Sequence, residues 1–434
     1  MRLKEYSRKE SHRKAYVSQE GLLLVGVDVS KDKHDVCTGT RADILRRKVQ
    51  VSNSRSGFDR LSDIIESDLH KTGCKRVLVA MEATGIYWYG LYHEMASRGY
   101  EVCLVSSQGV SHNRRTMPGG SSKTDRKDAY SIYDLLSQGK FFLPVKRDDQ
   151  LQASYRLMRR HASLEKRITR IRNQMRGTLH MAFPELQEEL GKITMPTALR
   201  FLRSNPTPAS ILRQGRSRFL ERWKPRRRCG QWKRDRFERI YELAKTSIGL
   251  KDPLRMTEYE IREQAEDLAD AVAKSKGWKD KAISLLEGRA DFKHLLQLPR
   301  MGQATVTAVL TATGGADEFS HGKQFVKLAG IDVREFQSGS SVHGRAHISR
   351  AGSAYLRHWM YFYSVQLVGH DAYFKAYFER KKKASPGPGS GKRALVAVAD
   401  KMLRIIYRML VTREDYSPDV HQRLEERYRL SQAA

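Results

Sequence analysis

The sequence contains few cysteines and no long apolar segment. Its four cysteines (Cys37, Cys74, Cys103 and Cys229) include no C-x-x-C pair, so neither a zinc ribbon nor a disulfide framework is expected. We expect the cysteines to be reduced thiols in the core. No apolar run approaches the roughly 18 residues of a membrane span, and residues 1–20 lack the apolar core of a secretory signal. We therefore expect a cytoplasmic protein that has no membrane partner.

Acidic residues are scarce relative to basic ones. The chain of 434 residues has 49 Asp and Glu against 80 Lys and Arg, which gives a formal net charge of +31. A surface of this charge attracts polyanions through phosphate neutralisation and counterion release. An anionic membrane would instead require an amphipathic basic helix beside a lipid anchor or a span. The charge therefore predicts a nucleic acid as the partner.

Two parts are predicted within residues 1–145. Residues 1–20 are basic and are expected to form a poorly ordered arm, whereas residues 21–145 have the pattern of an α/β domain with a mixed sheet. Within that domain, apolar runs predict strands at 22–27, 34–38, 46–51, 76–81 and 100–105. Helical spacing predicts helices at 58–69, 87–97 and 128–136.

Helical periodicity continues through residues 146–290. Apolar side chains recur at helical spacing from Leu151 to Leu179, while Arg and Lys occupy the other face. This pattern fits either a packing helix with a solvated face or a coiled-coil arm that dimerises along nucleic acid. The acidic helical segment at 256–273 is a suitable antiparallel partner for it. Residues 291–434 are predicted to form a third, mainly helical domain.

An insertion at about 185–250 interrupts this helical region with prolines and dense basic charge. Basic residues, including Arg226, Arg227 and Arg228, alternate there with the aromatic residues Phe219, Trp223, Trp232 and Phe237. Such a mixture suits phosphate contact combined with base stacking on RNA or unpaired strands. The alternative is a small basic subdomain in which the aromatic side chains form the core. The density of charge favours contact with nucleic acid.

Four carboxylates occupy positions at which metal sites are built. Asp28 and Glu82 end two predicted strands, and Asp125 and Asp128 share one face at the start of a helix. If these side chains converge, their repulsion requires a divalent cation, and their oxygen atoms suit Mg²⁺ or Mn²⁺. Two such ions can activate an attacking oxygen and stabilise a leaving one. Taken singly, each residue could instead cap a turn or a helix, or pair with an arginine.

A Ser/Gly-rich turn at 336–352 is the second candidate for chemistry. Glycine allows the backbone to approach a phosphate, Arg345 and Arg350 could neutralise that phosphate, and a serine hydroxyl could attack it. An ordinary anion-binding loop is the alternative. Spacing alone does not choose among the serines of this turn, which are Ser338, Ser340, Ser341 and Ser349.

Short motifs follow one another along the chain in a specific order. In the N-terminal part they are GVDVSKDK at 26–33, MEATGIY at 81–87 and KTDRKDA at 123–129. In the C-terminal part they are LPRMG at 298–302, FVKLAGI at 325–331, SG at 338–339 and ISRAG at 348–352. In this combination the chain resembles the DEDD-type insertion-sequence transposases. These are the bridge-RNA-guided serine recombinases of bacteria, to which pilin-gene invertases are related.

The resemblance implies a ribonuclease-H-like (RuvC-type) fold for residues 21–145, with Asp28, Glu82, Asp125 and Asp128 as catalytic metal ligands. It implies that Ser338 is the nucleophile and forms a covalent phosphoserine link to DNA. Donor and target DNA, a structured non-coding guide RNA and a homodimer or homotetramer on nucleic acid would be its partners, at the nucleoid in the bacterial cytoplasm. The candidate nucleic-acid contacts are Lys123, Arg226, Arg227, Arg228, Arg345 and Arg350.

Three alternatives to this function stay open. A nucleic-acid-binding protein without catalytic activity would show no change in strand breakage on replacement of Asp28 or Ser338. A metal-dependent junction nuclease would use the same carboxylates but water as the nucleophile. A site-specific DNA invertase of the same family would share the chemistry and differ only in the biological outcome. The arm at 1–20 and the insertion at 185–250 look longer than the family's core requires, so no contact in them is carried over from the resemblance.

Overall fold

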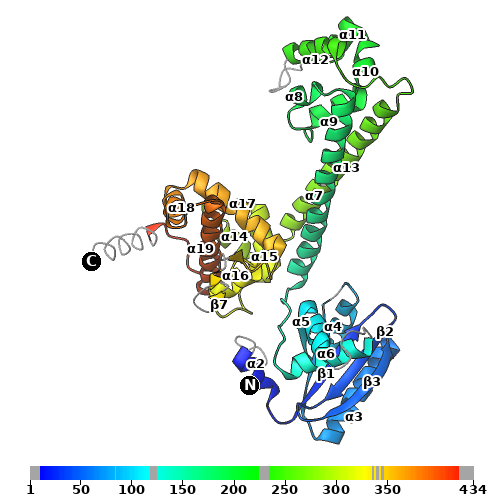
Figure 1. Cartoon of the computed structure of the whole chain (residues 1–434). Helices are drawn as coiled ribbons and strands as arrows, with labels where there is room; N and C mark the ends of the chain where they lie inside the picture. The colour runs from blue at the N-terminus through cyan, green and yellow to red at the C-terminus, as the bar shows by residue number, and fades with distance from the viewer. Residues whose placement is uncertain are drawn as a thin grey trace. The chain divides into compact units, whose positions relative to one another are not determined.

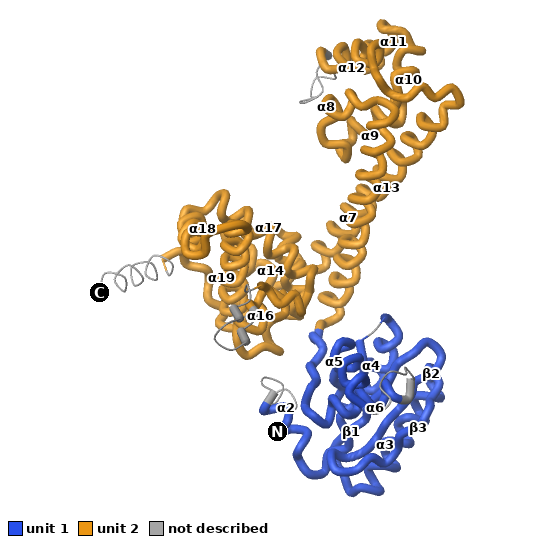
Figure 2. The backbone as a smooth tube through the Cα atoms, in the orientation of Figure 1, with its two compact units in different colours: residues 1–146 blue, residues 147–434 orange. Residues whose placement is uncertain are grey.

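The computed structural model describes residues 10–83, 85–117, 125–223, 234–334, 337–338, 342–343 and 347–419. The chain divides into two compact units, residues 1–146 and residues 147–434 (Figure 2). The first unit is a mixed α/β domain and the second is mostly helical, as the sequence predicts (Figure 1). Among the described residues, no helix combines the length and the apolar character that crossing a membrane requires.

A five-stranded sheet forms the centre of the first unit, with the strand order β3-β2-β1-β4-β5. Its strands are β1 (Leu22–Val29), β2 (Lys33–Gly39), β3 (Ile44–Ser52), β4 (Arg76–Glu82) and β5 (Glu101–Val105). β1, β2 and β3 pair antiparallel, whereas β4 and β5 extend the sheet parallel to β1. The five strands predicted from apolar runs are therefore confirmed, and the sheet is mixed.

Helices cover both faces of this sheet. α3 (Arg55–Thr72) and α4 (Trp88–Ser97) pack on one face, and α5 (Ser107–Thr116) and α6 (Asp125–Ser137) pack on the other. Residues of β1 alternate between the two cores, so that Val25 and Val27 pack with α3 and α4 while Leu24 packs with α6. This alternation decides the face to which each side chain at a strand end points.

Helix α2 (Glu10–Val17) corrects the expectation of a poorly ordered arm at residues 1–20. Tyr16 is fully buried in the same core as α6, and its hydroxyl donates a hydrogen bond to Glu101. The guanidinium carbon of Arg76 lies 5.2 Å from the centroid of the Tyr16 ring. The buried ring of Tyr16 thus anchors a segment whose charge alone predicted exposure to solvent. Residues 1–9 lie outside the described part of the chain.

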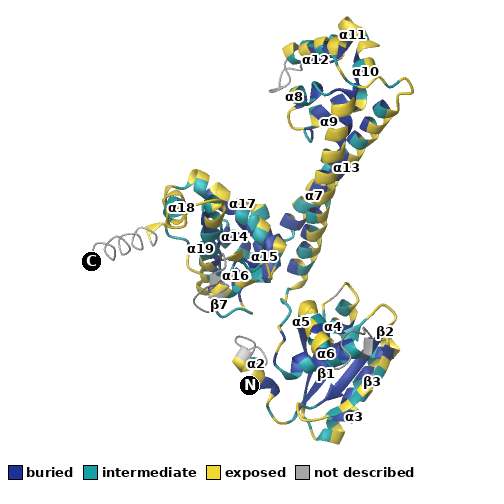
Figure 3. Ribbon diagram, in the orientation of Figure 1, coloured by how far each residue is buried: buried dark blue, intermediate teal, exposed yellow. Residues whose placement is uncertain are grey.

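The second unit contains a long antiparallel helix pair, α7 (Asp149–Ala182) and α13 (Met256–Ser284). Ser154 Oγ donates to the carbonyl of Ala282 at 2.9 Å, and Thr178 Oγ1 donates to Glu260 at 3.1 Å, so the start of each helix lies beside the end of the other. The predicted antiparallel pairing is thus confirmed. The buried residues of α7 face α13 within one chain (Figure 3). Dimerisation through this arm stays a prediction.

Five shorter helices form a subdomain between the two arm helices in the sequence. They are α8 (Leu186–Leu190), α9 (Pro196–Ser204), α10 (Pro208–Leu212), α11 (Arg216–Arg222) and α12 (Arg234–Thr246). Phe219, Trp223 and Phe237 belong to its core and are at most 4% exposed. The prediction that these aromatic rings stack on bases is therefore wrong, because they fill the interior. Outside the described residues lie Trp232, Arg226, Arg227 and Arg228.

The C-terminal part of the second unit is a helical domain with short strand pairs. Its helices are α14 (Ala290–Leu295), α15 (Gln303–Thr313), α16 (Gly322–Ala329), α17 (Ala354–His370), α18 (Ala372–Ala384) and α19 (Ser390–Thr412). Its strands are β6 (Val333–Arg334), β7 (Gln337–Ser338), β8 (Val342–His343) and β9 (His347–Ile348). A core around the fully buried Phe325 and Met402 holds α15, α16, α17 and α19 together and so supports the segment that carries these strands.

Candidate active site

Two of the predicted carboxylates lie at neighbouring strand ends. Val27 of β1 is paired with Met81 of β4 in parallel register, so the next residues, Asp28 and Glu82, are neighbours across the two strands. Val27 and Met81 pack in the core of α3 and α4. Because side chains alternate along a strand, Asp28 and Glu82 point to the opposite face, which α5 and α6 cover. Both are half-buried.

A third carboxylate, which sequence reasoning missed, lies in the same row. Asp35 of β2 is the antiparallel partner of Asp28, and directly paired side chains lie on one face about 5 Å apart. Asp35 is only 4% exposed, and its Oδ1 accepts a hydrogen bond from Gln50 Nε2 at 2.9 Å. Asp28 thus has a carboxylate on each of the two neighbouring strands.

Helix α6 is directed at this row of carboxylates. Gly26 lies so close beneath α6 that a Cβ at this position would be 2.8 Å from the Ala129 carbonyl oxygen and 2.5 Å from the Tyr133 nitrogen. Just beyond the end of α6, the Gly139 carbonyl accepts a hydrogen bond from Arg13 of α2 at 2.9 Å. Tyr16 of α2 bonds to Glu101 at the amino end of β5, which runs parallel to β4 and β1. The helix therefore runs from the carboxyl end of β1 toward its amino end. Its first turn, which begins at Asp125, lies on the side where β1 and β4 end.

The Asp128 carboxylate already has a cationic partner. Asp128 is 6% exposed, and its Oδ1 accepts a hydrogen bond from Arg114 Nη1 of α5 at 2.5 Å. The neighbouring Asn113 donates to Asp134 of α6 at 2.9 Å, which makes a second link between the two helices. Arg114 was not predicted as a site residue, because its position depends on the packing of α5 on α6. Lys123 and the side chain of Asp125 lie outside the described residues.

The donor atoms in this part of the sheet fit a hard divalent cation. Asp28, Glu82 and Asp128 offer only carboxylate oxygens, which are the ligands that Mg²⁺ and Mn²⁺ prefer. Among the side chains that the structure describes, no group of three or more His, Cys, Asp or Glu is arranged to hold a metal ion. Asp125, the remaining predicted ligand, is not one of those side chains. The metal site therefore stays a prediction whose donor chemistry is suitable.

The predicted nucleophile lies in a short hairpin. β7 and β8 pair antiparallel, with Ser338 opposite Val342. β6 and β9 pair outside them, with Val333 opposite Ile348. The side chains of Ser338 and Val342 are outside the described residues, as are Ser340, Ser341 and Arg345. The backbone thus places Ser338 in the inner strand pair of a nested hairpin.

The base of this hairpin is fixed by hydrogen bonds in which one of the candidate serines, Ser349, takes part. The Ser349 hydroxyl donates to the Asp332 carboxylate and accepts the Ala351 N–H at 3.3 Å, so it holds the turn together. Arg350 is exposed, has a left-handed φ of 52°, and donates its N–H to the Gly330 carbonyl at 3.0 Å. Its side chain is therefore available for a phosphate beside the hairpin.

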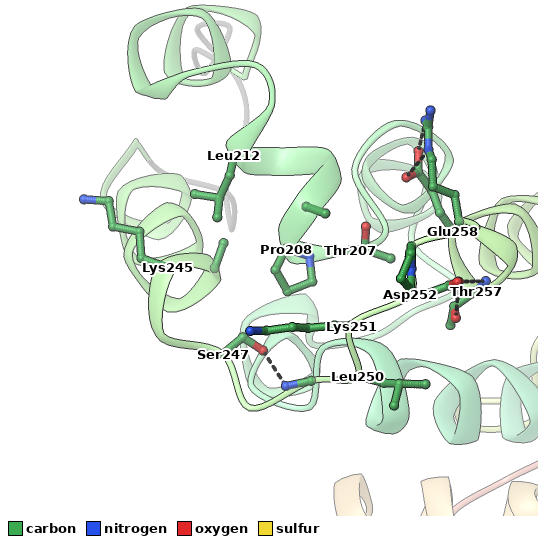
Figure 4. Close-up of a pocket in the computed structure, with 15 residues that line it drawn as sticks. Thr207, Pro208, Leu212, Lys245, Ser247, Leu250, Lys251, Asp252, Thr257 and Glu258 are labelled. Atoms are coloured by element: carbon green, nitrogen blue, oxygen red, sulfur yellow. Dashed lines mark hydrogen bonds and ion pairs between the residues drawn. The ribbon is translucent and has the colours of Figure 1, made fainter.

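A separate cavity of about 380 Å³ lies in the subdomain between the arm helices, and its carboxylates are already engaged (Figure 4). Asp252 accepts hydrogen bonds from the backbone N–H of Thr257 at 2.5 Å and from its hydroxyl at 2.7 Å. Glu258 is 3% exposed and forms ion pairs with Arg213 and Arg262, each at 2.7 Å. Both carboxylates therefore hold the loop and the start of α13 together, which is a structural role.

Replacing Glu258 by glutamine is expected to lower the free energy of unfolding of this subdomain by about 2 kcal/mol, because its arginines lose a shared counterion. Burial raises the pKa of Glu258, but hydrogen bonds from Arg255 and Arg213 and the charge of Arg262 outweigh it and lower the pKa. The stabilisation is therefore present above the pKa of the unfolded chain, about 4.3, and is lost as the pH falls from there through the folded pKa.

Urea unfolding followed by tryptophan fluorescence, at neutral and at acidic pH, measures this difference. Glu263→Gln, at an exposed position of the same helix, is the matched control and should change stability little. Equal losses in the two variants would contradict a specific role of the buried carboxylate.

Comparison with protein families gives matches to both units. A family model described as "Transposase" matches residues 25–184, which include all four predicted metal ligands. A second, described as "Transposase IS116/IS110/IS902 family", matches residues 292–379, which include Ser338. The two models together span more than half of the chain.

Curated relatives are similar over nearly the whole chain. The "insertion element IS110 uncharacterized 43.6 kDa protein" of Streptomyces coelicolor is 23% identical over 392 residues, which are 89% of this chain and 94% of the relative. The "transposase for insertion sequence element IS1111A" of Coxiella burnetii is 23% identical over 415 residues, 92% of either chain. The "pilin gene-inverting protein" of Moraxella bovis is 20% identical over 407 residues, 92% of this chain and 98% of the relative.

Proposed function

Because the chain belongs to the IS110-type DEDD transposases, which act on DNA, we propose that it cuts and rejoins DNA through a covalent phosphoserine intermediate. The observation that carries this proposal is the row of carboxylates at the ends of β2, β1 and β4, with α6 starting on the same side. The strand order β3-β2-β1-β4-β5, antiparallel and then parallel, supports a ribonuclease-H-like fold for residues 21–145.

In this proposal Asp28, Glu82, Asp125 and Asp128 hold Mg²⁺ or Mn²⁺. A bound divalent cation would supply charge neutralisation for the phosphodiester and for the leaving oxygen. Arg114 would have to share the Asp128 carboxylate with the cation or release it, because it now donates to that group. The protein's own contribution is to present Asp28 and Glu82 from adjacent strands of the sheet, and Asp125 and Asp128 from the first turns of α6, which packs on that face.

Ser338 is the nucleophile in the proposed reaction. Its hydroxyl oxygen attacks the phosphorus, the bond from phosphorus to one deoxyribose oxygen breaks, and that oxygen leaves as a hydroxyl after taking up a proton. The phosphodiester is conserved as a phosphoserine ester, so a hydroxyl of another DNA end can reverse the step and release Ser338. No nucleoside triphosphate is therefore required for rejoining.

The partners proposed are donor and target DNA, a structured guide RNA that selects them, and further copies of this chain in a dimer or tetramer. The net charge of +31 supports assembly on nucleic acid. The exposed Arg350 and the regions of Lys123, Arg226, Arg227, Arg228 and Arg345 are the proposed contacts. A second outcome, site-specific inversion of a DNA segment, is favoured by the similarity to the pilin gene-inverting protein and uses the same chemistry.

A denaturing gel tests the proposed function directly. Full-length protein is incubated with labelled element-junction DNA, RNA transcribed from the flanking region, and Mg²⁺, and a slow-migrating protein–DNA species is expected. Chelation of the metal, Asp28→Asn and Glu82→Gln should each reduce that species by roughly a hundredfold or more, because the developing charge is no longer neutralised. Asp63→Asn, at an exposed position of α3, is the matched control and should leave the yield unchanged.

The alternatives give different products in the same assay. Cleaved DNA with new ends but no protein adduct would show hydrolysis by water and would overturn the serine mechanism. An undiminished adduct in Asp28→Asn and Glu82→Gln would overturn the metal site. Full adduct formation without RNA would overturn RNA guidance while leaving the cutting and rejoining reaction in place.

A further inference from the structure

A large cavity lies next to the hairpin that carries Ser338. Its volume is about 760 Å³, and it is lined by β6, β9, α17 and α19 within the C-terminal domain. Sites for small organic ligands occupy about 300–1,000 Å³, so the cavity has room for a nucleotide. Two other cavities of the second unit, of about 290 and 380 Å³, are smaller. Of its lining residues, Arg350 alone is among the proposed nucleic-acid contacts.

The charge of this cavity is of one sign. Arg350, Arg357, Lys392 and Arg393 line it, and no Asp or Glu is among its lining residues in the described part of the chain. Arg357 donates to the Ala329 carbonyl at 2.8 Å, and Arg393 donates to carbonyls of the 385–388 loop. Those two arginines therefore shape the walls. Arg350 and Lys392 are exposed and are placed to meet an anion.

Helix α17 contributes an uncharged, aromatic surface to the same cavity. Tyr361 and His358 are lining residues one helical turn apart. Phe362, 54% exposed, lies beside both, with ring centroids 5.8 Å from Tyr361 and 4.8 Å from His358. Ile331 and Val396 add apolar wall. Flat aromatic faces next to cations are the arrangement with which proteins hold unpaired bases.

We propose that this cavity holds one unpaired nucleotide of the DNA strand next to the phosphodiester attacked by Ser338. The base stacks on Tyr361, and its phosphate lies between Arg350 and Lys392. The inference rests on the proposed function, because it specifies which part of the DNA substrate binds beside the hairpin that carries Ser338. A nucleotide inside a duplex is stacked on both sides, so only an extruded or unpaired one can enter.

The position of the cavity along the chain supports this assignment. Val333 lines the cavity and begins the segment that leads to Ser338 five residues later. Five extended residues span at most roughly 17 Å, so a strand bound in the cavity continues to within a few nucleotides of the serine. A pocket that removes one base from its stack would hold the neighbouring phosphodiester in a fixed register, which is what cutting at a defined bond requires.

Photocrosslinking of the full-length protein locates the nucleotide. The probe is a short single-stranded DNA with 5-iododeoxyuridine at one position, and its labelled peptide is identified by mass spectrometry. A crosslink to Tyr361 is expected from the single strand. It should be absent from the same sequence in a duplex. Crosslinks only to other parts of the chain would overturn the proposal.

Equilibrium binding of the same oligonucleotide measures the contribution of the cavity. Tyr361→Ala should weaken binding about tenfold, and Tyr361→Trp should restore it, because stacking needs only an aromatic face. Lys392→Gln should weaken binding about threefold and lower the slope of log affinity against log salt by about one. The matched controls are Tyr259→Ala, an exposed tyrosine of α13, and Lys323→Gln on α16.

The outcomes separate this proposal from the proposed function. Equal losses in the cavity variants and the controls, or losses seen only with RNA oligonucleotides, would overturn the nucleotide site. Absence of a phosphoserine adduct in the wild type would overturn the serine reaction instead. In that case a Tyr361 crosslink and its loss in Tyr361→Ala would still establish a single-strand site. Tyr361→Trp guards against misfolding, because it keeps a large aromatic face and leaves no void at this position.

Discussion

Ser338→Ala is expected to reduce the covalent protein–DNA species by more than about a thousandfold, to below detection on a denaturing gel. The variant loses the oxygen that forms the ester in the proposed reaction, whereas the carboxylates of the first unit and the basic charge of the chain are unchanged. DNA affinity should therefore stay within about twofold of the wild type. Adduct yield and equilibrium binding, measured on the same protein preparation, separate the two effects.

The other serines of the turn provide matched controls for Ser338. Ser340→Ala and Ser341→Ala remove hydroxyls from the same hairpin and should leave the adduct intact. Ser349→Ala should lower stability modestly, because the hydroxyl of Ser349 holds Asp332 and the Ala351 N–H together. A wild-type level of adduct in Ser338→Ala, with loss in one of these variants, would move the nucleophile to that serine. Unchanged adduct in all four would exclude the turn.

The strands of the first unit were predictable from sequence because each is a local apolar run. The run from Leu22 to Val27 is buried by both helical layers, and its composition reports that burial without any knowledge of its neighbours. The same reasoning placed Asp28 and Glu82 at strand ends, since each is the charged residue at which a buried run stops. Local signals therefore sufficed for the elements and for two of the carboxylates.

Residues whose role depends on register or on helix packing could not be found in this way. Asp35 lies in a predicted strand, but only the antiparallel register places it opposite Asp28. Arg114 reaches Asp128 because α5 packs on α6, which no periodicity in either helix reveals. Tyr16 and Trp223 were misinterpreted for a related reason. The composition of a segment gives its average charge, but whether a particular side chain such as Tyr16 or Trp223 is buried depends on its packing in the folded core.

The second large effect is expected from a residue that carries no functional group. Gly26→Ala should lower the free energy of unfolding of the first unit by about 3 kcal/mol, because overpacking cannot be relieved here. A Cβ at Gly26 would meet the Tyr133 nitrogen at 2.5 Å and the Ala129 carbonyl oxygen at 2.8 Å, and both are backbone atoms of α6. The helix must move away from β1, since no flexible side chain can yield in its place.

That displacement should also abolish cutting, although every carboxylate is retained. The close contact at Gly26 sets how near α6 lies to β1, so a shift of α6 away from the sheet separates Asp125 and Asp128 from the strand ends. Hydrogen-exchange mass spectrometry of the peptides at 22–29 and 125–137 measures the loosened contact, and the adduct assay measures the loss of reaction.

Gly90→Ala in α4 is the matched control. The space around Gly90 is open, and alanine there should stabilise the helix by about 0.5–1 kcal/mol. Reduced exchange protection with full adduct yield in Gly26→Ala would show that the site does not depend on the position of α6, and the DEDD assignment of Asp125 and Asp128 would then fail. Normal exchange protection would contradict the predicted clash at Gly26.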